Sequence, residues 1–148
     1  MKRSQIKRKP PSEKGKAVFR KQRLESISHF KKLAWTEFSK YIRARDKYTC
    51  YTCLKDYSGN ITRSLHAGHF ISRRMNSTLF DEMNVHAQCM FCNMYNYGST
   101  GAYAERLIKD YGMEEFQKLL KRGRESKQFT REELKEIANT YKQKLLEL

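Results

Sequence analysis

Cysteine, histidine and asparagine side chains concentrate in the middle of the chain, between positions 50 and 93. All four cysteines occur there as two Cys-x-x-Cys pairs, Cys50 with Cys53 and Cys89 with Cys92. Three of the four histidines lie between these pairs, at His66, His69 and His86. Thiolate and imidazole groups bind zinc, and imidazole beside asparagine or aspartate can form a hydrolytic metal site. We therefore interpret the cysteines as a structural site that positions the histidine and asparagine residues, which would carry out the chemistry.

The two cysteine pairs predict one structural zinc ion with four thiolate ligands. No apolar run approaches the about 20 residues that span a bilayer, and the basic N-terminus lacks the apolar core of a secretory signal. We therefore expect a cytoplasmic protein without a membrane partner, where reducing conditions favour metal binding over disulfides. The 35 residues between the pairs exceed a usual zinc-ribbon gap, so folded structure should separate them. A redox pair and unliganded thiols are the alternatives.

The charge of the chain points to a polyanionic partner. The formal net charge is +15, and residues 1–40, with thirteen Lys/Arg and three Glu, carry most of it. Nucleic acid is the commonest partner of such a protein, whereas a solubilising tail is the alternative. A membrane surface is disfavoured because the basic residues do not lie on a strongly amphipathic helix.

Three regions are expected along the 148 residues. Residues 1–22 form a basic, flexible arm; residues 23–100 hold an N-terminal helix and a zinc-bound core; residues 101–148 form a helical region. Apolar residues at helical spacing predict a helix from Leu24 to Arg45. Short strands are expected within residues 61–70 and 85–88. The last helix should begin at the capping box of Thr130, and its apolar stripe should pack against the core or a second subunit.

The histidine and asparagine residues have the types that phosphodiester hydrolysis requires. A divalent cation must neutralise the charge that grows on the phosphate and the leaving oxygen, and a base must deprotonate the attacking water. Neutral imidazole is a suitable base near pH 7. A histidine on a strand, followed by an asparagine at a helix start after a zinc knuckle, can bring these groups together as in a ββα-metal finger.

At these residues the chain resembles the HNH (His-Me finger) endonucleases. In their pattern a histidine ends the first strand, an asparagine opens the second, and a metal-binding residue opens the helix, which corresponds here to His69, Asn84 and Asn93. The asparagine directly after the final cysteine is also similar to the phage endonuclease VII family of junction resolvases. From Trp35 to the C-terminus the chain resembles the phage NinG (Rap) recombination proteins, through residues 41–46, 67–70, 84–93 and 141–145.

This resemblance implies an α+β fold, a small zinc-stabilised ββα-metal core flanked by N- and C-terminal helices. It implies a structure-specific DNA endonuclease that cleaves branched recombination intermediates, such as Holliday junctions and D-loops, with Mg²⁺ or Mn²⁺. The cuts would leave 5′-phosphate and 3′-hydroxyl ends. A phage-encoded protein would act in the cytosol of its bacterial host. Two symmetric cuts in a four-way junction favour a homodimer.

The resemblance also assigns roles to individual residues. His69 is expected to be the general base, Asn93 a ligand of the catalytic cation, and Asn84 an indirect residue that orders the loop holding His69. Many HNH nucleases carry an aspartate before the catalytic histidine, where this chain has Gly68. His66 is the expected substitute as a metal ligand, which requires a bulge near Gly68 because residues 66 and 69 face opposite sides of a regular strand.

Other assignments remain open at this point. His86 can bind metal, contact the scissile phosphate or pack. Candidates for DNA contact are basic residues at the helix end, after the first strand and in the arm: Arg43, Arg45, Arg73, Arg74, Lys7, Arg8 and Lys9. Two other functions remain: a non-catalytic zinc DNA-binding protein, and an HNH nuclease of restriction or homing type that acts on linear duplex.

Overall fold

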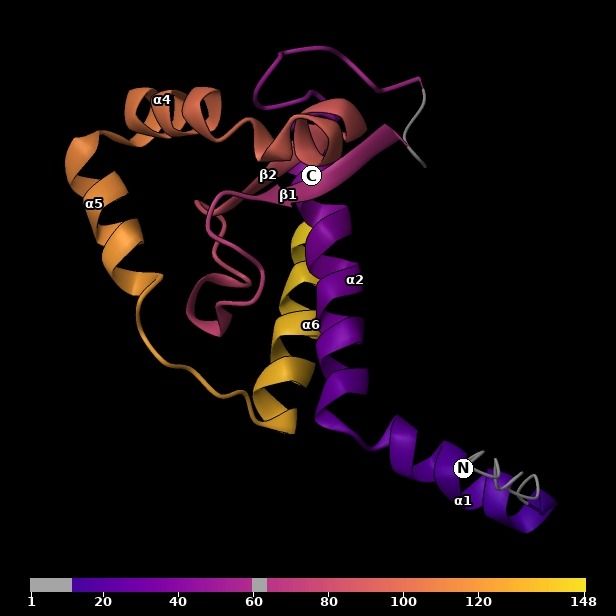
Figure 1. The fold of residues 1–148 in the computed structure, drawn as a ribbon. Coiled ribbons are helices and arrows are strands. Elements are labelled where there is room, and N and C mark those ends of the chain that lie inside the picture. Colours follow the sequence, from indigo (N-terminus) through magenta and orange to yellow (C-terminus); the bar gives the residue numbers. More distant parts are fainter. Residues whose placement is uncertain (1–11, 60–63) are drawn as a thin grey trace, which may run out of the picture.

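The computed structural model describes residues 12–59 and 64–148 of the chain. It has an α+β fold, as predicted, in which helices surround a two-stranded sheet (Figure 1). The helices are α1 (Glu13–Leu24), α2 (Ile27–Arg45), α4 (Thr100–Tyr111), α5 (Met113–Arg122) and α6 (Arg131–Leu146). The strands are β1 (Leu65–His69) and β2 (Val85–Cys89), and the short helical turns are η1 (Asn76–Thr78), η2 (Phe91–Tyr95) and η3 (Tyr97–Ser99).

Helix α2 begins at a side-chain cap and buries one stripe of its surface. The Ser26 side chain accepts a hydrogen bond from the backbone N–H of His29, which satisfies one of the free donors at the helix start. Ala34, Phe38 and Ile42 follow at intervals of four residues and are fully buried. The helix begins three residues after the predicted start, because Ser26 caps its N-terminus.

Helix α6 lies beside α2 along most of its length (Figure 1). Its N-terminus has the predicted capping box, in which the Thr130 side chain and the Glu133 side chain each bond the other's backbone N–H. Leu134 is fully buried, and Tyr141 and Leu145 pack against the cluster that includes Phe38. The apolar stripe of α6 is thus covered by this chain's own core.

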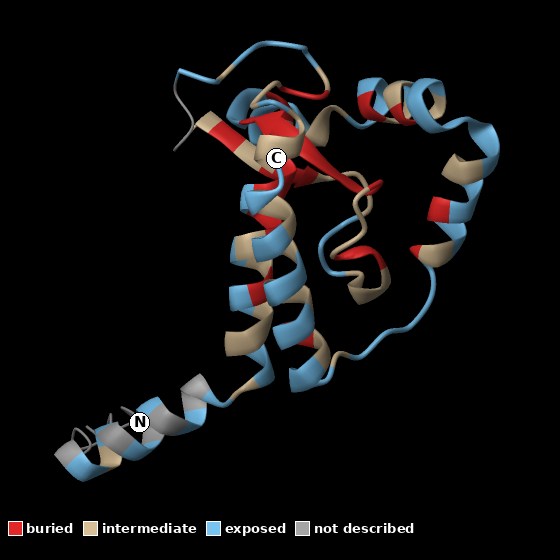
Figure 2. Cartoon of the chain, turned by 180° about the vertical axis from the view of Figure 1, so that it is seen from behind, coloured by how far each residue is buried: buried red, intermediate tan, exposed pale blue. Residues whose placement is uncertain are grey.

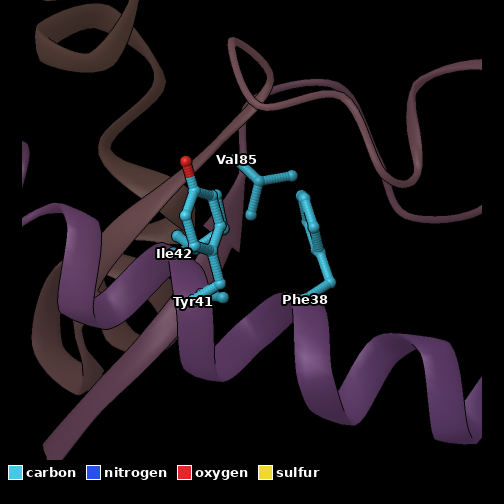
Figure 3. Packing of buried hydrophobic residues seen from close by; sticks show 5 residues of the cluster. Phe38, Tyr41, Ile42 and Val85 are labelled. Atoms are coloured by element: carbon cyan, nitrogen blue, oxygen red, sulfur yellow. The ribbon is translucent and has the colours of Figure 1, made fainter. Parts of the chain in front are cut away.

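The two strands form an antiparallel pair that α2 covers on one side. Leu65 lies opposite Cys89, and His69 lies opposite Val85. Val85 and Ala67 pack against Phe38 and Ile42 of α2 in the main core (Figure 3). A two-stranded sheet is marginal in water alone, so this contact and the cysteine cluster beyond it stabilise the pair. Every residue of β2 is buried, whereas those residues of α1 whose burial is described are mostly exposed (Figure 2).

Part of the segment expected to be a flexible basic arm is helical. Residues 12–22 contribute most of α1, whose first turn is closed by the Ser12 side chain accepting from the Gly15 N–H. The segment contains no proline after Pro11 and holds three Lys together with Glu, Ala, Arg and Gln, which favour helix. Lys7, Arg8 and Lys9 lie outside the described residues, as do residues 61–63 of the expected first strand.

Helices α4 and α5 form the predicted C-terminal helical region together with α6. Tyr103 and Leu107 of α4 and Leu119 of α5 are fully buried in a second cluster on the far side of the sheet. Gly112 separates the two helices with a φ of 84°, a conformation that side chains disfavour. Among the described helices, none combines the length and apolar character needed to cross a bilayer.

Candidate metal centres and nucleic-acid surface

The four cysteine sulfur atoms meet at one point beside the end of the sheet. All Sγ atoms of Cys50, Cys53, Cys89 and Cys92 lie within 4.8 Å of one another. Tetrahedral zinc with Zn–S bonds of about 2.3 Å would separate its sulfurs by about 3.8 Å, and Cys53 Sγ lies 3.9 Å from Cys89 Sγ. The donor set therefore fits a structural zinc ion, and the predicted pairing of the two Cys-x-x-Cys motifs is confirmed.

Backbone donors already point at these sulfurs. The N–H of Cys89 donates to Cys50 Sγ over 3.3 Å, and the N–H of Cys92 donates to Cys89 Sγ over 3.4 Å. Such donors stabilise thiolates, the form that binds zinc. Leu65 and Ala87 pack around the cluster, which ties β1 and β2 to the turn after α2.

His66 and Asn93 are brought together at the edge of the sheet. Asn93 is the first residue after the second cysteine pair, so the cysteine cluster fixes where η2 presents it. Its Nδ2 lies 2.9 Å from Nδ1 of His66 on β1. Both side chains are partly buried, and they line a hollow of about 310 Å³ together with Arg43 and Arg73. Turning the Asn93 amide would offer its oxygen, beside the imidazole nitrogen, to a cation.

His69 lies on the opposite side of β1, against α2. Its ring stacks on Trp35 with the ring centroids 4.9 Å apart and an interplanar angle of 20°. Its Nε2 lies 3.2 Å from the carbonyl oxygen of Leu79. Because a carbonyl only accepts, Nε2 carries the hydrogen, and in the neutral ring Nδ1 is then free to accept a proton. Burial lowers the pKa of His69 to about 4, with a smaller contribution from Arg73, so the ring is neutral at pH 7.

The expected bulge near Gly68 is absent. Strand β1 pairs with β2 residue by residue from Leu65 to His69, and side chains of a regular strand alternate between faces. His66 and His69 therefore face opposite sides. Gly68 serves a different purpose, because a Cβ built there would lie 2.3 Å from Oε1 of Gln88. Glycine permits the Gln88 side chain to cross β1 and donate to the carbonyl of Gly98 over 2.7 Å.

Asn84 holds the loop between the strands through three side-chain hydrogen bonds. Its side chain is fully buried. The Oδ1 atom accepts from the Ile71 N–H over 2.6 Å, and Nδ2 donates to the carbonyls of Ile71 and Thr78 over 3.1 and 2.9 Å. Leu79 follows Thr78 in this loop, and its carbonyl oxygen contacts His69.

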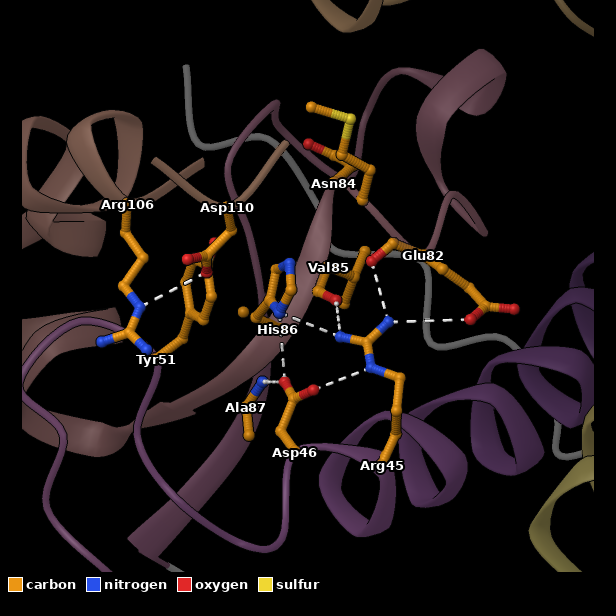
Figure 4. Close-up of polar contacts among 12 residues, drawn as sticks. Arg45, Asp46, Tyr51, Glu82, Asn84, Val85, His86, Ala87, Arg106 and Asp110 are labelled. Carbon is orange, nitrogen blue, oxygen red and sulfur yellow. Dashed lines mark hydrogen bonds and ion pairs between the residues drawn. The ribbon is translucent and has the colours of Figure 1, made fainter. Parts of the chain in front are cut away.

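His86 belongs to a separate polar cluster on the other face of the sheet (Figure 4). It is 4% exposed, its ring stacks on Tyr51 with a 3.7 Å separation, and it does not line the hollow of His66. Nδ1 lies 2.9 Å from Nη2 of Arg45 and 3.3 Å from a carboxylate oxygen of Asp46. A guanidinium only donates and burial lowers the pKa of His86, so a neutral ring that accepts from Arg45 fits the shorter contact.

The basic residues expected to contact DNA divide into two kinds. Arg45 uses its guanidinium within the chain, where it donates to the backbone carbonyls of Glu82 and Val85 and bonds Asp46. Among the described residues, by contrast, Arg43, Arg73 and Arg74 make no ion pair with a carboxylate. Burial lowers the pKa of Arg43.

Two lysines that were not among the predicted DNA-contact residues lie on α2 near Arg73, together with Trp35. Lys31, Lys32 and Trp35 line a hollow of about 300 Å³ next to that of His66. Trp35 packs against the core cluster and also lines both hollows. The signal that identifies these residues is their position on the α2 helix, at intervals of three or four from Arg43.

Comparison with known proteins gives a consistent family. The family model described as "Bacteriophage Lambda NinG protein" matches residues 1–148. The ninG protein of Escherichia phage 933W is 32% identical over 138 residues, which are 91% of this chain and 66% of that protein. The ninG protein of Salmonella phage P22 is 34% identical over 139 residues, 90% of this chain and 64% of that protein. The ninG protein of Escherichia phage lambda is 32% identical over 136 residues, which are 90% of this chain and 64% of that protein.

The chain thus spans about two thirds of the length of these relatives. No solved structure matches it. The family model covers the whole chain, including the zinc-compatible cluster, the His66–Asn93 pair and the buried Asn84. The chain belongs to the NinG family of bacteriophage proteins.

Proposed function

We propose that this protein is a metal-dependent DNA endonuclease of the HNH type that cleaves branched recombination intermediates. The observation that carries the proposal is the 2.9 Å contact between His66 and Asn93 at the end of the cysteine knuckle. Two ligand-type side chains from distant parts of the chain meet there, beside Arg43 and Arg73, in a hollow of about 310 Å³. Cationic side chains next to a pair of metal ligands suit a substrate that carries phosphate.

His66 and Asn93 would hold the divalent cation, whose charge polarises the phosphate and stabilises the leaving oxygen. In the part of the chain that the structure describes, no carboxylate lines this hollow. Mg²⁺ prefers oxygen ligands, whereas Mn²⁺ tolerates imidazole better. We therefore expect Mn²⁺ to bind more tightly than Mg²⁺ and to support faster cleavage. Calorimetric titration of both metals into zinc-loaded protein, with Asn93→Ala as the control, measures the binding directly.

His69 would act as the general base. Its Nε2–H is held by the Leu79 carbonyl, which leaves Nδ1 to take a proton from the attacking water. As the water oxygen bonds to phosphorus, the bond from phosphorus to the 3′ oxygen breaks, which yields a 5′-phosphate and a 3′-hydroxyl. Arg43 and Arg73 would neutralise the phosphate. Asn84 would act indirectly, as a positioning residue for the loop that carries Leu79.

A specific observation favours a second candidate, a zinc-stabilised DNA-binding protein without catalysis. His66 and His69 lie on opposite faces of β1, and the expected bulge that would turn them toward each other is absent. In that case His66 and His69 would have structural roles only. This protein would bind DNA without Mg²⁺ or Mn²⁺ and would cut neither branched nor linear DNA.

The test is cleavage of an end-labelled four-way junction and a linear duplex of the same sequence, with either metal. We expect wild-type protein to cut the junction preferentially, and His69→Ala and Asn93→Ala to lose at least 100-fold in rate while zinc content and DNA binding persist. His29→Ala, a histidine of α2 outside both hollows, is the matched control. Junction binding without cuts under both metals would instead support the second candidate. Preferential cutting of the linear duplex would indicate a restriction or homing type of enzyme.

Resolution of a four-way junction requires two symmetric cuts, so we also propose that the active form is a homodimer. The apolar stripe of α6 is occupied by α2 of the same chain, and the interface would therefore use another surface. Light scattering of the protein alone and on a junction tests this, and a monomer in both states would exclude it.

A further inference from the structure

A second line of side chains runs along α2 beside the stripe that enters the core. Ser28, Lys32, Trp35, Ser39 and Arg43 follow at intervals of three or four residues, which places them on one side of the helix. They line two hollows of about 300 and 310 Å³. From Ser28 to Arg43 the helix rises about 22 Å, at 1.5 Å per residue.

The two hollows adjoin each other. Trp35 and Arg73 belong to the linings of both. The guanidinium carbon of Arg73 lies 5.0 Å from the centroid of the Trp35 ring, so the pair forms the shared wall. The resulting surface, the α2 groove, leads from the start of α2 to the His66–Asn93 pair. Its residues are Ser28, Lys31, Lys32, Trp35, Ser39, Arg43, Leu65, His66, Ala67, Arg73, Leu79 and Asn93.

The α2 groove carries positive charge without compensation. Among the residues that the structure describes, neither lining contains Asp or Glu. In residues 12–59 and 64–148, no carboxylate lies within 4.0 Å of its four cations, Lys31, Lys32, Arg43 and Arg73. Elsewhere such pairs occur, as between Arg122 and Asp81 at 2.9 Å. The Lys31 ammonium contacts only the neutral amide oxygen of Asn76, over 2.6 Å.

Arg43 gives a second indication of an anionic ligand. It is half-buried, and burial lowers its pKa in the absence of a neighbouring carboxylate. Desolvating a guanidinium is costly unless an anion compensates it. A phosphate group bound in the groove would supply that anion, and guanidinium groups match phosphate through paired hydrogen bonds.

We propose that the α2 groove binds the sugar–phosphate backbone of the DNA strand that leads to the His66–Asn93 pair, with Trp35 against a sugar or base. A length of about 22 Å corresponds to about six base pairs of B-form DNA at 3.4 Å each. The proposal rests on the proposed function only in naming the strand that is cut, because binding itself requires neither metal nor cleavage.

Trp35 is the only tryptophan in the chain, so its fluorescence reports on the groove without modification of the protein. Titration with a duplex and a four-way junction, in buffer without added Mg²⁺ or Mn²⁺, should change the emission saturably and protect Trp35 from acrylamide. Affinity is measured in parallel from the anisotropy of labelled DNA at several salt concentrations. Lys32→Gln and Arg73→Gln should each reduce the slope of log K against log salt by about one, and the double variant by about two.

Lys109→Gln on α4 is the matched control and should keep the wild-type slope, because Lys109 is exposed and lines neither hollow. Unchanged slopes in both groove variants, or DNA binding that leaves Trp35 emission and acrylamide access unchanged, would overturn the proposal. The outcome is separable from the nuclease proposal. Reduced slopes in a protein that cuts no DNA support the groove alone, whereas efficient cutting with unchanged slopes supports the nuclease alone.

Discussion

Replacement of Asn84 by alanine tests how the loop beneath His69 is held. Asn84→Ala removes three hydrogen bonds from a fully buried position. The N–H and carbonyl of the partly buried Ile71 then lose their side-chain partner, and an orphaned polar group costs about 1–3 kcal/mol, with the upper end reached only on full burial. Loss of the hydrogen bond to the Thr78 carbonyl costs less, because this oxygen also accepts from the Asp81 N–H over 3.3 Å. The expected loss in free energy of unfolding is about 3–5 kcal/mol.

This loss is a large fraction of the about 5–15 kcal/mol by which domains are usually stable. With a urea m-value of about 2 kcal/mol/M, the midpoint of unfolding should fall by about 2 M. The assay is urea unfolding of zinc-loaded protein followed by Trp35 fluorescence, which reports directly on this region because the ring stacks on His69. If the proposed function holds, Asn84→Ala should also slow DNA cleavage, through displacement of the Leu79 carbonyl.

Asn93→Ala is the matched asparagine control. Asn93 is partly buried and its side chain makes a single hydrogen bond, to His66, so its loss should change stability by less than about 1 kcal/mol. The two variants should therefore separate folding from metal binding. If Asn84→Ala unfolds within 1 kcal/mol of wild type, the loop is held by other contacts and the reasoning about its orphaned groups is refuted.

Three further predictions concern zinc, pH and Gly68. Wild-type protein should contain one zinc ion per chain by elemental analysis, and Cys53→Ser should lose both the zinc and cooperative thermal unfolding. The pKa of His69 is lowered from 6.5 to about 4 by burial, so the unfolded state binds more protons between these values. The contribution of His69 to the free energy of unfolding should be constant above pH 6.5 and fall by up to about 3 kcal/mol as the pH drops to 4. His69→Gln should reduce this loss. Gly68→Ala should destabilise by about 2–4 kcal/mol through its clash with Gln88, and Gln88→Ala should recover part of that loss in the double variant.

Each of these predictions has a contrary result. Full zinc content in Cys53→Ser would show that this sulfur is not a ligand. An NMR titration that gives His69 a pKa near 6.5 would contradict the assignment of a buried neutral ring. Additive effects of the changes at Gly68 and Gln88 would mean that the two side chains do not compete for the same space.

Local patterns predicted the parts of the fold that depend on neighbours in sequence. The stripe from Ala34 to Ile42 predicted α2, and the capping box at Thr130 predicted the start of α6, because both signals repeat at the spacing of a helical turn. The two Cys-x-x-Cys motifs predicted a cysteine cluster, since each motif forms a compact turn and thiols share one chemistry. The first strand was predicted within residues 61–70, and the structure forms it over Leu65–His69.

Contacts between distant segments decided the rest. The sequence determined which side chains are available: four cysteines that can hold zinc, His66, His69 and Asn93 for the proposed site, and an excess of basic residues. Only the tertiary structure decided that Asn93 meets His66 and that His69 lies against Trp35, because strand register and the helix that covers each face are long-range properties. The same long-range packing enclosed His86 with Arg45 and, among the described residues, left Lys31, Lys32 and Arg43 of α2 without a carboxylate partner. Whether a charged side chain is neutralised depends on which segments fold beside it, and no local pattern encodes that.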